Sequence, residues 1–148
     1  MQDALEDNNP ILRALAIRTM GCIRVSQITE YLVDPLREAL KDEDSYVRKT
    51  GVICIAKLYE CNPEMIERLG FIKMLENLLT DGNAMVVSNA IAVLGQISDQ
   101  KGENLVHIND HLANKLINAL SEANEWGKTY ILDAFAKYEP SNPKIAEE

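Results

Sequence analysis

The sequence predicts an all-α fold of the armadillo/HEAT type, a right-handed α-solenoid. The first observation is a pattern of 19 residues that occurs four times without a gap, starting at Leu5, Leu40, Leu79 and Leu120. The starts lie 35, 39 and 41 residues apart, which is the period of armadillo and HEAT arrays. The second observation is the composition: 47% of the residues are hydrophobic and only 5% are aromatic, which favours packed helices over an aromatic-rich β-sandwich.

Each copy of the pattern reads as a turn followed by a helix. An acid occupies the third position in every copy: Asp7, Asp42, Asp81 and Glu122. The fifth position carries an Asn or Asp whose side-chain oxygen can cap the following helix: Asn9, Asp44, Asn83 and Asn124. The helix body is apolar almost all round, as in "GVICIAKL", so we expect burial on more than one side. A very small residue at the seventeenth position should let a neighbouring helix approach closely: Gly21, Ala56, Gly95 and Ala136.

A second helical element lies before the pattern in each later repeat. In residues 26–40 it carries Asp34 and Pro35 in the middle. Proline suits the first turn of a helix but strains its interior. This stretch is therefore either one kinked helix or two helices, with Asp34 capping the second.

The next two copies of this element have clearer boundaries. In residues 62–79, Asn62 is expected to cap a first helix, Gly70 to interrupt it and a second helix to resume directly afterwards. The third copy, residues 108–120, is expected to begin near Asn109 or Asp110. Residues 100–107 read as a loop.

The repeats predict one solenoid segment over residues 1–148 with about three and a half repeats. Their expected bounds are 5–24 (partial), 26–60, 62–99 and 108–138. The first repeat lacks its preceding helix, and no repeat has the polar outer face of a capping repeat. We therefore expect a segment excised from a longer trunk. Its two ends should expose apolar helix faces, and the chain should self-associate.

Charge and cysteine content restrict the compartment and the partners. The net charge of −8 argues against nucleic acid or an anionic membrane as a partner of the whole chain. No apolar run is long enough to span a bilayer, and no leader is visible. Cys22, Cys54 and Cys61 are odd in number and lack C-x-x-C spacing, which indicates a reduced intracellular compartment. We expect the first two in the core and the third in a turn.

We find no arrangement of residues that predicts catalysis or a cofactor. His107 and His111 are four residues apart, near Asp110, but no third metal ligand is evident and the acid is not in H-E-x-x-H register. Surface histidines explain them better. The expected function is therefore that of a non-enzymatic scaffold, because an extended solenoid offers a long surface for other proteins.

Two sets of charged residues are candidate functional groups. The first is an acid–base pair six residues apart that recurs and predicts a ladder between adjacent repeats: Asp7 with Arg13, Asp42 with Arg48, and Glu122 with Lys128. Val87 breaks the pattern in the third copy. Exposed ladder pairs contribute about 0–1 kcal/mol each. The second set could contact an acidic partner or a phosphoinositide headgroup, or could be ordinary solvated charge: Arg18, Arg24, Arg37, Lys49 and Lys57. Trp126 either packs between repeats or anchors a partner.

Several long strings, in order, resemble the amino-terminal trunk of the beta-adaptins. They are "ITEYL", "PLREALKDEDSYVRKT", "AKLYE", "MVVSNAIAVLGQIS" and "EWGKTYILDAF". The resemblance covers about residues 5–138. It implies an all-helical trunk within a heterotetrameric clathrin-associated adaptor complex, with a medium subunit, a second large subunit and a small subunit as partners.

The resemblance also implies where the protein acts. Such a complex is peripheral on coated vesicles of the Golgi, endosomes or plasma membrane and sorts cargo in intracellular transport. Clathrin would be reached only through regions absent from this chain, and the membrane only peripherally, as part of the complex. The alternatives are a coatomer beta-type coat subunit and a nuclear-transport-type solenoid that holds a basic cargo peptide along an acidic surface.

Overall fold

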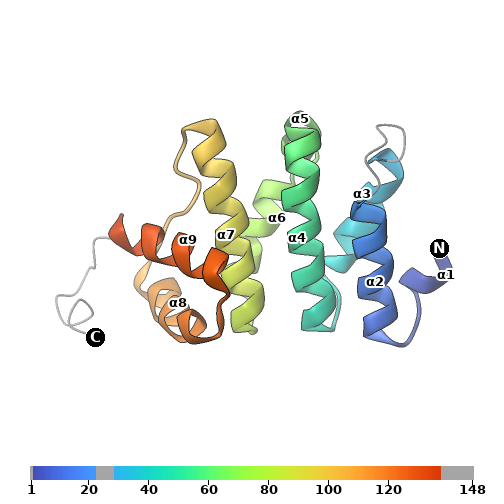
Figure 1. Ribbon diagram of the computed structural model, residues 1–148, viewed down its shortest axis with the longest axis horizontal. Helices are drawn as coiled ribbons and strands as arrows, with labels where there is room; N and C mark the ends of the chain where they lie inside the picture. Colours follow the sequence, from blue (N-terminus) through green and yellow to red (C-terminus); the bar gives the residue numbers. More distant parts are fainter. Residues whose placement is uncertain (1, 23–28, 138–148) are drawn as a thin grey trace. The chain divides into compact units, whose positions relative to one another are not determined.

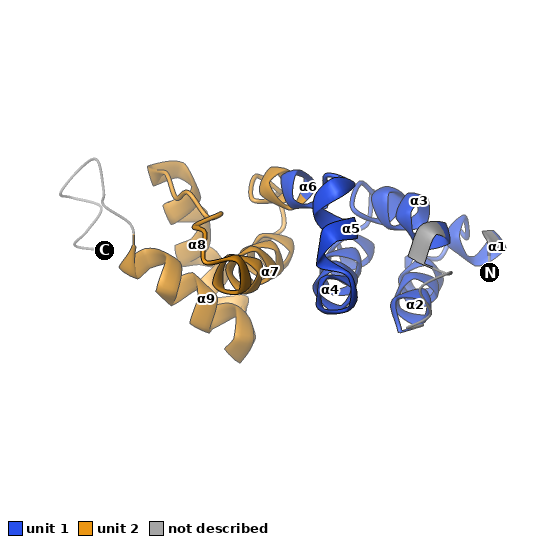
Figure 2. Cartoon of the chain, turned by 90° about the horizontal axis from the view of Figure 1, so that it is seen from above, with its two compact units in different colours: residues 1–74 blue, residues 75–148 orange. Residues whose placement is uncertain are grey.

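The computed structural model describes residues 2–22 and 29–137, and every regular element within them is an α-helix (Figure 1). The chain divides into two compact units, residues 1–74 and 75–148, which Figure 2 colours separately. The all-α prediction is confirmed for the described residues.

The first unit is built on the packing of two long helices. It contains α1 (Gln2–Leu5), α2 (Pro10–Gly21), α3 (Thr29–Ala39), α4 (Ser45–Cys61) and α5 (Pro63–Arg68). Helix α2 packs along α4, and α3 contacts both. The side chains of Val52, Ile55 and Ile66 are fully buried, so this unit has an aliphatic core. Helix α6 (Phe71–Leu78) spans the boundary between the units.

The second unit is organised around one buried helix. It contains α7 (Ala84–Lys101), α8 (Asp110–Glu122) and α9 (Glu125–Ala136), and α7 contacts both of the others. All side chains from Val86 to Leu94 are buried. A helix covered on more than one side is what the apolar repeat pattern predicts.

The predicted N-caps are confirmed in all four copies. A side-chain oxygen of the cap accepts a backbone N–H of the first helical turn, which otherwise has no partner inside the helix. The bonds are Asn9 to Ile11 at 3.0 Å, Asp44 to Tyr46 at 2.8 Å, Asn83 to Met85 at 2.9 Å and Asn124 to Gly127 at 2.7 Å. Turn and helix therefore begin where the sequence places them.

Two helix boundaries differ from the expectation. Helix α3 is continuous with Pro35 inside it, so the alternative of two helices is wrong. Leu32, Leu36 and Ala39 of α3 are buried on one side, and this packing outweighs the loss of one backbone hydrogen bond to proline. Helix α7 runs to Lys101, beyond the predicted start of the loop.

Other boundaries follow the prediction. Asn62 caps α5 by accepting from Met65 N at 3.1 Å. Gly70, with φ of 76°, separates α5 from α6, which is a conformation that glycine adopts without strain. Asn109 caps α8, which begins at Asp110.

The small residue at the seventeenth position permits close packing in the first unit. A Cβ atom on Gly21 would lie 2.8 Å from the Sγ of Cys54, so only glycine fits there without a shift. Cys54 itself is buried and donates to the carbonyl of Ile17 at 3.5 Å. Cys22 is exposed, contrary to its predicted burial, because it follows the last residue of α2. Cys61 is exposed, but it is the last residue of α4, so its predicted place in a turn is wrong.

Candidate functional site

The turn before α4 brings together a pair of charged residues from adjacent repeats. The guanidinium of Arg13 donates from Nε to Oδ2 of Asp42 and from Nη2 to Oδ1, each at 2.8 Å. The two side chains are only 11% and 13% exposed. In such a forked pair, two parallel hydrogen bonds join the guanidinium to the carboxylate, so the opposite charges attract and their relative orientation is fixed. It joins the ninth position of one repeat to the third position of the next.

Asp42 also shapes its own turn. Its Oδ1 accepts the backbone N–H of Asp44 at 2.9 Å, and Asp44 in turn caps α4. The same hydrogen bond occurs in two other copies. Asp7 Oδ1 accepts the backbone N–H of Asn9 at 2.8 Å, and Asp81 Oδ1 accepts that of Asn83 at 2.8 Å. An aspartate two residues before the cap is therefore a turn-forming residue as well as a charge.

The arginines at the ninth position fold back onto the turn of their own repeat. Arg13 donates from Nη1 to the carbonyl of Asp7 at 2.7 Å, and Arg48 donates from Nη1 to the carbonyls of Asp42 and Glu43 at 2.8 and 3.0 Å. The pairs six residues apart thus meet through a backbone oxygen. In the fourth copy the structure forms no ion pair between Glu122, which is exposed, and Lys128.

The electrostatics of the Arg13–Asp42 pair favour the charged forms. Burial acts to raise the pKa of Asp42, but the hydrogen bonds from Arg13 and from Asp44 N–H, together with the charges of Arg13 and Arg48, hold it below its ordinary value. The hydrogen bond to Asp42 raises the pKa of Arg13. Both groups therefore stay ionised at neutral pH.

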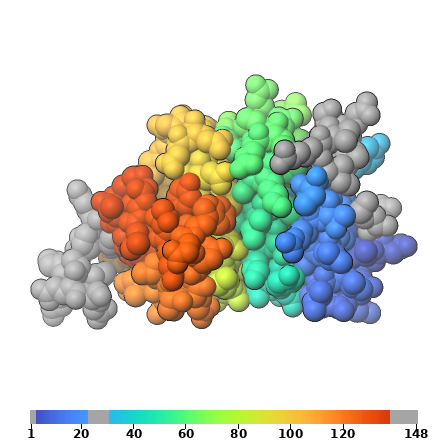
Figure 3. All heavy atoms as spheres, in the orientation of Figure 1, coloured from blue at the N-terminus to red at the C-terminus, as the bar shows by residue number. Residues whose placement is uncertain are grey.

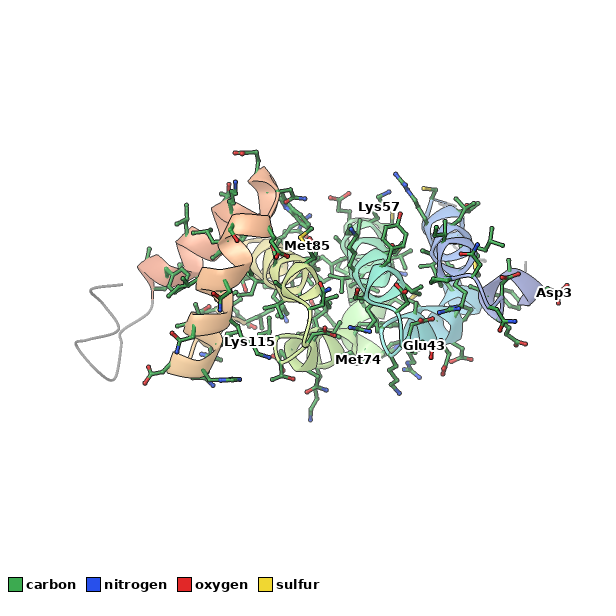
Figure 4. The ribbon with its side chains drawn as sticks, turned by 90° about the horizontal axis from the view of Figure 1, so that it is seen from below. Asp3, Glu43, Lys57, Met74, Met85 and Lys115 are labelled. Carbon is green, nitrogen blue, oxygen red and sulfur yellow. The ribbon has the colours of Figure 1, made fainter. Side chains whose placement is uncertain are left out.

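In the third copy a different residue takes the place of the missing arginine. The side chain of Val87 has no donor for the turn, and Lys115 of α8 instead donates from Nζ to the carbonyls of Thr80 and Asp81 at 2.8 and 3.1 Å; Lys115 is labelled in Figure 4. Sequence reasoning missed Lys115. No signal in one sequence connects position 87 with a lysine on the following element.

Several of the candidate partner contacts are already engaged within the first unit. Arg37 donates from Nη2 to the carbonyl of Leu69 at 2.9 Å, and its guanidinium carbon lies 5.8 Å from the centre of the Phe71 ring. The ammonium of Lys49 lies 4.9 Å from the centre of the Tyr46 ring. These side chains fix local structure.

The other basic candidates differ in their surroundings. Arg18 and Lys57 are exposed on α2 and α4, and Lys57 Nζ lies 3.9 Å from the Sγ of Cys22 (Figure 4). The positive charges of Lys57 and Arg18 act to lower the pKa of the buried Cys54 thiol, but burial outweighs them. Arg24 lies outside the described residues.

The second unit has a small polar hollow of about 170 Å³ between α7, α9 and the loop that joins α7 to α8. Asp99, His107, Tyr130 and Asp133 line it, and Asp133 is bonded to Lys137 at 2.7 Å. Burial and the nearby carboxylates raise the pKa of Tyr130, which weakens it as an acid. Tyr130 is therefore a weaker proton donor than an ordinary tyrosine.

The residues considered for metal or partner binding lie on different elements, although His107 and His111 line one hollow of about 300 Å³. His107 lies in the loop after α7 and His111 on α8, so they do not share a helix. Within residues 2–22 and 29–137 no three His, Cys, Asp or Glu side chains form a metal-binding group. Trp126 is half-buried and packs edge-on against Tyr130 of its own helix, with ring centres 6.2 Å apart. No helix of the described part is long and apolar enough to span a membrane.

Comparison with known proteins gives the fold and the family. A family model described as "Cnd1: non-SMC mitotic condensation complex subunit 1" matches residues 11–148. Among solved structures, a designed armadillo repeat protein superposes with a TM-score of 0.55 at 24% identity, over 90% of this chain and 61% of that one. The prediction of an armadillo/HEAT-type solenoid is thereby confirmed.

Curated relatives are more similar in sequence. AP-1 complex subunit beta-1 of Homo sapiens is 51% identical over 143 residues, which is 96% of this chain and 15% of that protein. AP-1 complex subunit beta of Dictyostelium discoideum is 51% identical over 146 residues, 99% of this chain and 16% of that protein. The chain thus spans a small part of the length of these relatives. It belongs to the family that the Cnd1 model describes and, by its identity to the AP-1 beta subunits, to the beta-adaptins.

Proposed function

We propose that this chain is part of a scaffold subunit of a clathrin-associated adaptor complex and acts in vesicle-mediated protein transport. The observation that carries the proposal is the 51% identity to an AP-1 beta subunit over 96% of the chain. A solenoid fold agrees with this function, because stacked repeats form an extended surface that other proteins can bind. The chain acts by assembly and performs no chemistry of its own.

The partners in this proposal are the medium subunit, a second large subunit and the small subunit of the same complex. The protein would work in the cytoplasm, peripherally on coated vesicles of the Golgi, endosomes or plasma membrane. We assign no clathrin contact to these 148 residues. The names of the relatives, which are complex subunits, support membership in such an assembly.

Within this function we propose that the ladder residues set the register of adjacent repeats and do not bind partners. The forked bond between Arg13 and Asp42 supports this, because it joins two repeats and is mostly buried. A buried forked pair specifies one geometry even where its net contribution to stability is small. Glu122 and Lys128 belong to the same proposal by their positions in the pattern.

Of the basic candidates, we propose Arg18 and Lys57 as the groups open to an acidic partner or headgroup. Both side chains are exposed and lie on adjacent helices, and Lys57 makes a long contact of 3.9 Å to the exposed Cys22 thiol. Arg37 and Lys49 are engaged with the protein's own carbonyl or ring. The charge reversals Arg18→Glu and Lys57→Glu should weaken an acidic contact without unfolding the chain.

Co-expression with the candidate medium and small subunits from the same source, followed by co-purification through the medium subunit, tests the proposed function. The chain should be retained with at least one adaptor set. A coatomer set serves as the alternative coat. Retention by the coatomer set alone, or by none, would contradict the assignment to an adaptor complex.

A further inference from the structure

Helices α2 and α4 concentrate positive charge in a chain whose net charge is −8. Helix α2 contains no acidic residue, and the only acid of α4 is Glu60, next to its last residue. The two helices, which pack along one another, carry five basic residues: Arg13, Arg18, Arg48, Lys49 and Lys57. An anionic group is therefore attracted to this part of the first unit.

Three of the five basic side chains are engaged within the protein. The two arginines at the ninth pattern position donate to their turns, and Lys49 lies over a tyrosine ring of its own helix. Arg18 and Lys57 are exposed. These two are the cations that can receive an anion from outside the chain.

The charged groups of Arg18 and Lys57 are set about one helical turn apart. Cys22 follows Arg18 by four residues, so it lies on the same side of α2, about 6 Å further along the axis. The ammonium of Lys57 lies 3.9 Å from the Sγ of Cys22. Two carboxylates at positions i and i+4 of a partner helix have the same spacing.

The side of α4 that carries Lys57 also offers apolar surface. Tyr46, Ile53 and Lys57 lie on one stripe of the helix, because Ile53 and Lys57 follow Tyr46 by seven and eleven residues. Tyr46 is 43% exposed and Ile53 is half-buried. Helix α4 contacts α2, α3 and α5, which precede and follow it, so this stripe does not lie at an end of the chain.

We call these four side chains the basic face: Arg18, Tyr46, Ile53 and Lys57. Figure 3 shows atoms of its two helices on the side toward the viewer, with α2 in blue and α4 in teal to green.

We propose that the basic face binds an acidic amphipathic helix of a protein partner. Two carboxylates of that helix, one turn apart, meet Arg18 and Lys57, and an apolar residue about three turns away lies against Tyr46. This inference rests on the proposed function and deepens it, because it states which kind of acidic group the two cations receive.

The number of cations favours a protein segment over an anionic membrane. Recognition of anionic lipid headgroups by a charged surface uses clusters of about four to eight Lys or Arg. The described part of this face offers two exposed cations, and the net charge of −8 opposes approach to an anionic surface. A short helix needs fewer charges, because apolar contact contributes to its binding.

A designed pair of peptides tests the basic face on the full chain. The acidic peptide is an alanine-rich helix with leucine at position 4 and glutamate at positions 11 and 15, and the neutral peptide has glutamine at both glutamate positions. In fluorescence anisotropy at low salt, the acidic peptide should bind about 3- to 30-fold more tightly, as expected for two exposed ion pairs. This preference should shrink at about 0.5 M salt, since exposed charges are screened.

Substitutions separate the charged contacts from the apolar one. Arg18→Gln and Lys57→Gln should each reduce the preference for the acidic peptide, whereas Tyr46→Ala should weaken the binding of both peptides alike. Lys73→Gln is the matched control, since Lys73 is an exposed lysine of the same unit outside the face, and it should leave the preference unchanged. Circular dichroism should show the same helix content for every variant.

Three results would overturn the proposal. The first is equal binding of the two peptides at low salt, and the second is a preference that survives in both glutamine variants. The third is binding to vesicles of phosphatidylcholine with about 20% phosphatidylserine that both variants lose, without any preference between the peptides. Retention by an adaptor medium subunit together with equal peptide binding would contradict the basic face alone and leave the adaptor assignment in place.

Discussion

At the scale of the residue, Asp42 explains why the stretch "KDEDSYVRKT" is so charged. It accepts the backbone N–H that closes its turn, it receives the guanidinium of Arg13 from the preceding repeat, and its carbonyl accepts from Arg48. Asp44 then caps the helix. Most of this charge serves local structure, and a binding motif is not needed to account for it.

Asp42→Asn should lower stability most at neutral pH. Asparagine keeps an oxygen for the turn but loses the charge that Arg13 meets. Because the pKa of Asp42 is lower in the folded state than its ordinary value of 3.8, the pair stabilises the fold above that value. This contribution disappears as the pH falls through the folded-state pKa.

Urea unfolding of the unchanged chain and of the variant across the acid range measures this effect. The variant should lose part of the dependence of stability on pH below about 3.8. Glu43→Gln is the comparison, since that side chain is 92% exposed and lies 3.9 Å from the same Arg13 Nη2, so the pH dependence should change less than in Asp42→Asn. Parallel pH curves for Asp42→Asn and the unchanged chain would show that the pair contributes nothing.

The three cysteines should differ sharply in reactivity. Burial raises the pKa of the Cys54 thiol to about 11, so little thiolate forms at mildly alkaline pH. Cys22 and Cys61 are exposed. A maleimide followed by mass spectrometry at pH 8 should modify the two exposed thiols first and Cys54 only when the protein unfolds. Equal labelling rates would contradict the burial of Cys54.

At the scale of the element, the contact between α2 and α4 depends on the absence of a side chain at Gly21. Gly21→Ala places a methyl group 2.8 Å from the Sγ of Cys54. Overpacking of this kind costs about 1–3 kcal/mol, and the better helix propensity of alanine offsets up to ~1 kcal/mol. Urea unfolding should therefore show a net loss of stability.

A second substitution tests whether steric overlap causes the loss of stability in Gly21→Ala. Cys54→Ala removes the atom in the way, so the loss in Gly21→Ala with Cys54→Ala should be smaller than the sum of the two single losses. Strict additivity would mean that Gly21 and Cys54 do not limit the approach of the helices.

Lys115 of α8 should matter to the second unit because it takes the place of a missing arginine. Lys115→Met keeps the apolar stem but loses the bonds to the carbonyls of Thr80 and Asp81. We expect a loss of about 1 kcal/mol in chemical denaturation. Lys137→Met, which removes an exposed contact of 2.7 Å to Asp133, should cost less. A larger loss of stability in the comparison variant than in Lys115→Met would show that the bonds of Lys115 to the turn contribute little.

At the scale of the whole molecule, the sequence predicts what is local and repeated. The caps Asn9, Asp44, Asn83 and Asn124 follow from side-chain chemistry at a fixed position. The period predicts the fold class because each repeat can bury its apolar face only against another. Local signals of this kind depend on a few neighbouring residues, so one chain suffices to find them.

Features that depend on tertiary packing escape such reasoning. Pro35 stays inside α3 because the buried face of that helix holds it together, and proline alone predicts a break. Cys22 is exposed because α2 ends at Gly21, a boundary that hydrophobicity does not mark. The bond from Arg13 to Asp42 spans 29 residues, and only the repeat register shows that these two groups can meet.

The proposed function makes this repeat array an assembly surface for an adaptor medium subunit. A titration of the purified chain against the purified amino-terminal domain of that subunit tests it most directly, with a basic nuclear-localisation peptide as the competing ligand. We predict saturable binding to the medium subunit, retained in Asp42→Asn once that variant is shown to be folded, and no binding to the peptide. Binding to the peptide alone would contradict the account and favour a transport receptor.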